Sequence, residues 1–138
     1  MENKEGLIWY DGNLVDWKDA KLHVLTHGLH YASSVFEGER SYSGRIFKLH
    51  EHTERLLYSA SELDFEIPYS IDEIKQASYL TLEKNNLVDA YIRPIAWRGA
   101  ETVGVSAQNT KIHFAIAVWE WPSYFSPEDK LKGIRLTV

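Results

Sequence analysis

The chain has 138 residues, of which 44% are hydrophobic and 25% charged, a composition typical of one folded domain and not of a disordered segment. Its net charge of -5 argues against nucleic acid or anionic membranes as partners, because both require a basic surface. The absence of cysteine excludes disulfide frameworks and thiolate nucleophiles. The longest wholly apolar run, residues 114–119, is much shorter than the roughly 20 residues that cross a bilayer, and the N-terminus is polar, so we expect a cytoplasmic protein.

Strands and tight turns are predicted for the first third of the chain. Asp11-Gly12-Asn13 separates two apolar runs and indicates a β-hairpin, and Ser43-Gly44 indicates a second hairpin between two longer extended runs. Residues 26–32 are expected to form about one helical turn. The expected strands are residues 7–10, 14–15, 21–25, 34–42 and 45–49.

Two helices followed by two long strands are predicted for the middle of the chain. Ser70 and Glu73 have the spacing of a capping box, which marks the start of the second helix. The strands are rich in β-branched and aromatic residues. The expected helices are residues 50–63 and 70–86, and the expected strands are residues 91–97 and 112–121.

The last residues suggest a boundary between domains. Ser126-Pro127 is expected to open a short helix. Residues 134–138 are expected to form an apolar strand, whereas the ends of a domain are usually polar and exposed. We expect residues 1–125 to form an N-terminal α+β domain, and residues 126–138 to be an interdomain segment with the first strand of a missing C-terminal domain. The order of elements indicates an α+β fold with helices packed on one face of a mainly antiparallel sheet.

The histidines do not have the spacing of a metal site. Zinc requires three or four converging ligands, whereas His27 and His30, and His50 and His52, form only pairs. His50-Glu51-His52 also differs from the HExxH pattern. We therefore expect solvated or hydrogen-bonded histidines and no metal.

Two sets of polar residues are candidates for anion binding. Arg55, on the predicted helix 50–63, is either a solvated residue paired with Glu51 or a phosphate-binding group. Tyr91 and Arg93 lie two residues apart on a predicted strand and so face the same side. They form either an ordinary exposed strand face or a carboxylate site, and spacing alone does not decide between these.

Aromatic residues raise a similar choice. Trp121 and Tyr124 come where a strand enters a loop, and they either pack against a neighbouring helix or form an apolar wall for a small ligand. Tyr31 and Phe36 raise the same question.

These segments together resemble a known family. The stretch 27–40, HGLHYASSVFEGER, is similar to the early signature of branched-chain amino acid aminotransferases, which belong to class IV of the pyridoxal-phosphate aminotransferases. Residues 8–12, the run 50–60 and Asn85-Asn86-Leu87 leading to Tyr91-Ile92-Arg93-Pro94 resemble the family in the same order. The resemblance covers about residues 7–138 and implies the small N-terminal domain of the fold-type IV pyridoxal-phosphate enzymes.

The resemblance also implies roles for single residues. Arg55 matches the arginine that binds the cofactor phosphate. Tyr91 matches a tyrosine near the substrate α-carboxylate, and Arg93 matches the arginine that receives the side-chain carboxylate of glutamate. Val105, in the loop 99–110, approaches the neighbouring subunit's site in this family, and Tyr31 usually acts across the dimer interface. The residues that match the substrate side-chain pocket are Tyr31, Phe36, Trp121 and Tyr124.

The implied activity of the whole enzyme is transfer of the amino group between leucine, isoleucine or valine and 2-oxoglutarate through pyridoxal 5'-phosphate, in a homodimer or larger homo-oligomer. The family's Schiff-base lysine lies downstream of residue 138, and no lysine of this chain matches it. The chain therefore has no catalytic residue of its own, and we expect it to be inactive alone. The alternatives are another class IV enzyme, namely a D-amino acid aminotransferase or aminodeoxychorismate lyase, and a non-catalytic α+β module for binding or assembly.

Overall fold

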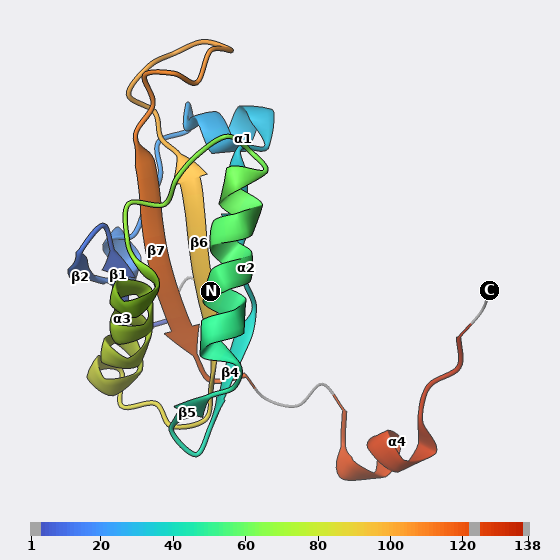
Figure 1. The fold of residues 1–138 in the computed structure, drawn as a ribbon. Helices are drawn as coiled ribbons and strands as arrows, with labels where there is room; N and C mark the ends of the chain where they lie inside the picture. The colour runs from blue at the N-terminus through green and yellow to red at the C-terminus, as the bar shows by residue number, and fades with distance from the viewer. Residues whose placement is uncertain (1–3, 122–124, 137–138) are drawn as a thin grey trace.

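One antiparallel sheet of seven strands forms the centre of the computed structural model, which describes residues 4–121 and 125–136 (Figure 1). The strands follow the order β2-β1-β7-β6-β4-β5, and β3 also pairs with β6. The mainly antiparallel sheet predicted from the sequence is confirmed. The strands are β1 (Leu7–Tyr10), β2 (Asn13–Asp16), β3 (Ser34–Phe36), β4 (Glu39–Tyr42), β5 (Arg45–Ile46), β6 (Ala90–Arg98) and β7 (Ile112–Trp119).

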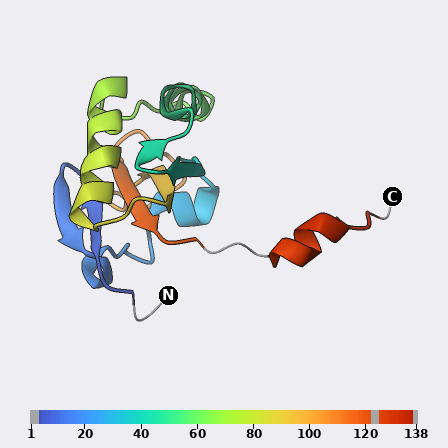
Figure 2. The same cartoon turned by 90° about the horizontal axis from the view of Figure 1, so that it is seen from below.

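The helices lie mainly on one side of this sheet, as predicted. Figures 1 and 2 show α2 and α3 side by side on one face of β6 and β7, with α1 at one end of the sheet. The helix α4 buries none of its residues and lies apart from these layers (Figure 2). The helices are the 3-10 helix η1 (Trp17–Asp19), α1 (His27–Tyr31), α2 (Leu49–Ser61), α3 (Ile71–Lys84) and α4 (Pro127–Lys132).

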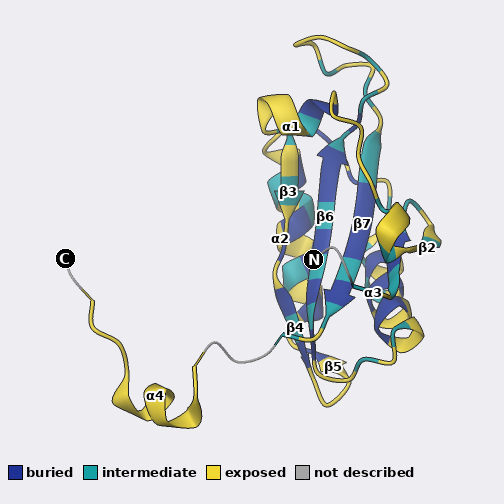
Figure 3. Cartoon of the chain, turned by 180° about the vertical axis from the view of Figure 1, so that it is seen from behind, coloured by how far each residue is buried: buried dark blue, intermediate teal, exposed yellow. Residues whose placement is uncertain are grey.

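The alternation of side chains along β6 separates a core face from a helix-free face. Ile92 and Ala96 are 0% exposed and point toward α2 and α3, where they meet Leu56 and Ile74. Burial of a side chain such as Leu56 contributes about 1.5–3 kcal/mol to stability. Tyr91, Arg93 and Ile95 alternate with these residues and are half-buried on the opposite face. That face carries no α-helix where β6 and β7 run (Figure 3), and only Trp17 of the 3-10 helix η1 reaches it, at Trp119 of β7. We call it the helix-free face in this sense.

The predicted helix starts are confirmed in detail. The Ser70 hydroxyl accepts a hydrogen bond from the Glu73 amide, and the Glu73 carboxylate accepts one from the Ser70 amide at 2.7 Å, which completes the capping box. Ser126 caps α4 through its hydroxyl, with Pro127 at the first position of the helix. None of the helices in the described part of the chain has the length and apolar character needed to span a bilayer.

Several predicted strands were wrong in extent or existence. Residues 21–25 are exposed and form no strand, and residues 134–136 are also exposed and lie outside the sheet. An alternating pattern forms a strand only where a neighbouring edge can accept its hydrogen bonds. The run 34–42 breaks into two strands at Glu37 and Gly38, and the run 45–49 leaves the sheet after Ile46. Residues 137–138 of the last predicted strand lie outside the described residues.

Candidate functional site

The centre of the helix-free face is a pair of polar side chains on β6. Arg93 Nη2 donates a hydrogen bond to the Tyr91 hydroxyl at 2.7 Å. Strand β3 pairs Phe36 with Ile95, so the Phe36 ring centroid lies 4.3 Å from the Arg93 guanidinium carbon. The prediction that Tyr91 and Arg93 face the same side of the strand is confirmed, and Phe36 joins them from a segment more than fifty residues away.

An aromatic stack holds the Tyr91 ring in place. The ring centroids of Trp119 and Trp121 lie 4.9 and 4.8 Å from that of Tyr91. On its other side, the Tyr91 hydroxyl occupies the space where a side chain at Gly38 would be, since a Cβ there would overlap the hydroxyl oxygen. Glycine at this position is therefore required for the Tyr91 hydroxyl to reach Arg93. Tyr124, predicted for the same aromatic wall, lies outside the described residues.

Arg55 is fixed by Glu37 and not by its helical neighbour. Arg55 Nε and Nη2 donate to the two carboxylate oxygens of Glu37 at 2.5 and 2.6 Å, and His52 lies 2.9 Å from the same carboxylate. Glu51, the alternative partner, pairs with Lys48 instead. Burial by itself raises the pKa of Glu37, but the hydrogen bonds from Arg55 and His52 outweigh it, so the pKa of Glu37 lies below its ordinary value. Sequence reasoning missed Glu37, which faces the same side as Glu39 by strand alternation.

The arrangement around Arg55 fits a phosphate group. The Arg55 side chain is 63% exposed, whereas the Glu37 side chain is almost fully buried. Glu37 therefore holds the guanidinium from the protein interior and leaves its outer side open to solvent. The two hydrogen bonds to Glu37 come from Nε and Nη2 of Arg55. Nη1 has no acceptor among the described residues and can bind another group. A planar guanidinium with free N–H groups is a preferred partner for a phosphate dianion.

Tyr31 and Val105 form a second group at the C-terminal end of β6. The His27 ring lies 3.1 Å from the Val105 carbonyl oxygen and 4.6 Å, between centroids, from the Tyr31 ring. Tyr31 is 48% and Val105 77% exposed. Figure 1 shows α1 and the loop 99–110 together at this end of the sheet. The structure thus brings Tyr31 and Val105 together around the His27 ring.

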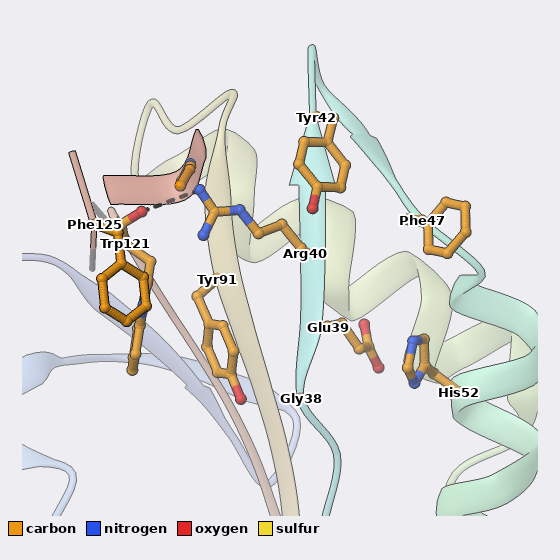
Figure 4. A pocket seen from close by; sticks show the side chains of 10 residues that line it. Gly38, Glu39, Arg40, Tyr42, Phe47, His52, Tyr91, Trp121 and Phe125 are labelled. Carbon is orange, nitrogen blue, oxygen red and sulfur yellow. Dashed lines mark hydrogen bonds between the residues drawn. The ribbon is translucent and has the colours of Figure 1, made fainter. Parts of the chain in front are cut away.

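A hollow of about 640 Å³ borders the Tyr91 stack (Figure 4). Gly38, Arg40, Tyr91 and Trp121 line it, and Glu39 lies on the side of α2. Glu39 is only 2% exposed, and neither of its carboxylate oxygens has a hydrogen-bond partner among the described residues. Burial, with a smaller effect from the charge of Glu37, raises the pKa of Glu39 to about 8. Glu39 is therefore mostly uncharged at neutral pH.

The loop 99–110 is tied to the sheet by a histidine between two acids. His113 of β7 contacts Asp11 through Nδ1 at 2.5 Å and Glu101 through Nε2 at 2.7 Å. The other oxygen of Glu101 accepts a hydrogen bond from the Lys111 amide. Burial alone lowers the pKa of His113, but the two carboxylates outweigh it, so the pKa of His113 lies above its ordinary value of 6.5. The His113 imidazole therefore links the base of this loop to β7 and Asp11.

Replacing His113 by glutamine is expected to loosen the loop. The Lys111 amide should exchange its hydrogen about tenfold faster in His113→Gln at low pH, which corresponds to about 1.4 kcal/mol. Because the pKa of His113 is raised on folding, the stabilisation is fully present below pH 6.5 and is lost as the pH rises through the folded value. Exchange measured by NMR and corrected for its intrinsic pH dependence should therefore converge for the two proteins at high pH. Equal protection at low pH would contradict this expectation.

Comparison with known proteins gives the class to which this fold belongs. The chain belongs to the class IV aminotransferases: the model of the Amino-transferase class IV family matches residues 34–137. The chain is 46% identical over 140 residues to the branched-chain-amino-acid aminotransferase of Pseudomonas aeruginosa, a match that covers 99% of this chain and 46% of that relative. The corresponding protein of Escherichia coli strain K12 is 40% identical, with coverage of 95% and 44%. The family resemblance found in the sequence is thereby confirmed.

Solved structures give the same result. A crystal structure of the E. coli branched-chain amino acid aminotransferase matches with a TM-score of 0.84 at 40% identity and covers 91% of this chain and 43% of that one. The branched-chain aminotransferase of the archaeon Thermoproteus uzoniensis with norvaline matches with a TM-score of 0.82 at 34% identity, with coverage of 88% and 42%. The chain spans about half the length of the curated relatives it matches.

Proposed function

We propose that residues 1–138 are the N-terminal part of an aminotransferase that moves the amino group between leucine, isoleucine or valine and 2-oxoglutarate by means of pyridoxal 5'-phosphate. The observation that carries this proposal is the hydrogen-bonded pair of Arg93 and Tyr91 beside the Phe36 ring. The identity of 46% to a branched-chain-amino-acid aminotransferase supports it. The residue ranges 1–125 and 126–138 for the N-terminal domain and the interdomain segment belong to the same proposal.

The substrate pocket has to accept both aliphatic and acidic side chains. Phe36 and Trp121 offer apolar surface for the branched-chain group. Arg93 forms no ion pair with a carboxylate of the described residues, so its guanidinium is available to the side-chain carboxylate of glutamate. When an aliphatic side chain enters, water hydrates the polar rim instead. Tyr91 would bind the α-carboxylate, and Tyr124 would extend the aromatic wall.

We assign the cofactor phosphate to Arg55. When bound, pyridoxal phosphate supplies the electron sink that allows the α-proton of an amino acid to leave. The task of Arg55 is to hold the phosphate through the N–H groups that Glu37 does not use, while Glu37 fixes the plane of the guanidinium. No lysine of this chain matches the family's Schiff-base lysine, so we assign no catalytic residue to it.

A substrate screen of the complete protein tests the proposed reaction. Transfer from L-leucine, L-isoleucine or L-valine to 2-oxoglutarate is the expected result. Activity confined to D-alanine, or release of pyruvate from aminodeoxychorismate, would support the other class IV enzymes instead. Absence of turnover with every substrate would favour the non-catalytic binding or assembly module.

The 138-residue chain alone is expected to be unable to transaminate. Loss of a covalent catalytic group commonly removes several orders of magnitude in rate, and here no such group is matched. The measurement is leucine-dependent formation of glutamate with added pyridoxal phosphate, with the complete protein as positive control. Detectable turnover by the purified chain would overturn this expectation.

We also propose that the protein is a homodimer or larger homo-oligomer, with Tyr31 and Val105 reaching the neighbouring subunit's site. The support is an apolar surface on α1 and the loop 99–110, where Leu29, Tyr31, Val103 and Val105 are 63%, 48%, 81% and 77% exposed. A patch of this kind tends to associate. Light scattering of the chain at high concentration should give a dimer or larger mass, and a clean monomer would count against the proposal.

A cytoplasmic location and a role in branched-chain amino acid biosynthesis stay predictions.

A further inference from the structure

Arg40 is a charged residue on the helix-free face that has no role in the proposed reaction. It lies on β4 directly opposite Tyr91 in the strand register. Its Nε is buried and has no hydrogen-bond partner among the described residues, and no carboxylate in the described ranges forms an ion pair with its guanidinium. A partly buried guanidinium in such surroundings normally pairs with an acid. Arg40 therefore requires another explanation.

Apart from the Tyr42 ring, whose centroid lies 5.7 Å from its guanidinium carbon, Arg40 contacts a backbone carbonyl. Arg40 Nη2 donates a hydrogen bond of 3.0 Å to the Trp121 carbonyl oxygen, 81 residues away in the sequence (Figure 4). Trp121 follows the end of β7, at the point where the chain leaves the sheet. The bond thus attaches the segment after β7 to the edge of the sheet formed by β4.

The position of Trp121 matters to the polar pair on β6. Its ring lies against the Tyr91 ring, with centroids 4.8 Å apart at an interplanar angle of 33°. The Tyr91 hydroxyl in turn accepts the hydrogen bond from Arg93. A contiguous chain of contacts therefore runs from Arg40 through Trp121 to Tyr91 and Arg93. Because Gly38 lies against the other side of the Tyr91 hydroxyl, Tyr91 is held between Gly38 and the stack.

We propose that Arg40 is a positioning residue for the substrate side-chain pocket: by binding the Trp121 carbonyl it holds the Trp121 ring on Tyr91 and so sets the aromatic wall. The effect on substrate binding rests on the proposed function, whereas the effect on the position of the Trp121 ring does not. Lysine at position 40 would keep the charge and one donor but not the planar group that reaches a carbonyl from a fixed direction. Methionine would keep the aliphatic stem and lose the donor.

The geometric part is tested on the 138-residue chain without any activity. Near-ultraviolet circular dichroism reports the asymmetric packing of Tyr91 with its tryptophan neighbours. Trp121→Ala identifies the part of the near-ultraviolet signal that depends on the Trp121 ring. Arg40→Met should reduce that same part of the signal, and Arg40→Lys should reduce it less. Arg45→Met, at an exposed arginine of the neighbouring strand β5, is the matched control and should leave the spectrum unchanged. An unchanged spectrum in Arg40→Met, with far-ultraviolet signal and unfolding midpoint retained, would overturn the proposal.

The substrate part is tested on the complete enzyme with a double-mutant cycle. Arg40→Met should raise the KM for L-leucine about tenfold and change kcat less than twofold, because the wall is displaced while the reacting groups are intact. In the Trp121→Ala background, the same change should alter KM less than twofold. An equal loss in both backgrounds, or a fall in kcat without a change in KM, would refute the role. If the complete enzyme fails to turn over any amino acid, the proposed function fails, and the dichroism result still decides whether Arg40 fixes Trp121.

Discussion

Replacing Glu39 by glutamine is expected to make the domain more stable relative to the wild type as the pH rises. The carboxyl group is 2% exposed and has no hydrogen-bond partner among the described residues. Burial, assisted by the charge of Glu37, raises the pKa of Glu39 from 4.5 to about 8. The folded protein therefore keeps a proton that the unfolded chain releases near its ordinary pKa.

The sign of the effect follows from this difference in proton binding. Between the unfolded and folded pKa values of Glu39, the native state binds more protons than the unfolded state, so the free energy of unfolding falls as the pH rises. The loss is about 1.4 kcal/mol for each pH unit, or about 3 kcal/mol between pH 4.5 and pH 7. A glutamine cannot ionise and does not have this loss. Its own unpaired amide adds a cost that is independent of pH and so does not affect the slope.

The measurement is chemical denaturation of the wild type and Glu39→Gln at a series of pH values. The difference in unfolding free energy should grow in favour of the variant from about pH 5 to about pH 7.5 and level off above pH 8. Glu66→Gln is the matched control, because Glu66 is an exposed acid in the connection between α2 and α3, and it should show no such slope. A constant difference across the whole range would mean that Glu39 is ionised in the folded protein.

Local chemistry made much of the fold predictable from the sequence. The capping box at Ser70 and Glu73 depends on two residues three apart, and the common face of Tyr91 and Arg93 depends on strand periodicity. Arg55 is recognisable as an anion-binding candidate because it lies away from much of the apolar stripe of its helix. The strand predicted at 21–25 failed because its pattern is local, whereas a strand also needs a partner edge that only the tertiary fold provides.

The partners of the site residues were less predictable than the residues themselves. Glu37 is 18 residues from Arg55, and no local rule links a loop residue between two short strands with a helix that follows them. The burial of Glu39 had a weak signal, since alternation places it on the same side as Glu37 and opposite to Phe36. The bond from Arg40 to the Trp121 carbonyl had none, because any residue type supplies that acceptor.

Replacing Arg93 by methionine in the complete enzyme is expected to separate the two classes of substrate. The guanidinium lies beside the Phe36 ring, bonds to the Tyr91 hydroxyl and has a buried Nε without a partner among the described residues. Glutamate or 2-oxoglutarate would leave its side-chain carboxylate unpaired in the variant, at a cost of about 3 kcal/mol or roughly a hundredfold in kcat/KM. Leucine has no group that contacts the guanidinium, so its kcat/KM should change by no more than about threefold.

The two half-reactions measured separately distinguish this role from a general structural one. In Arg93→Met, the Tyr91 ring should keep its contacts with Trp119 and Trp121, and Gly38 still provides room for the hydroxyl, so the proposed α-carboxylate site should persist. The leucine half-reaction should therefore proceed while the glutamate half-reaction slows. An equal loss in the leucine and glutamate half-reactions would mean that Arg93 only supports Tyr91 and does not bind the acidic side chain. Arg93→Lys keeps the charge without the planar group, so it should recover part of the glutamate half-reaction. If the role of Arg93 were only structural, this variant should recover nothing.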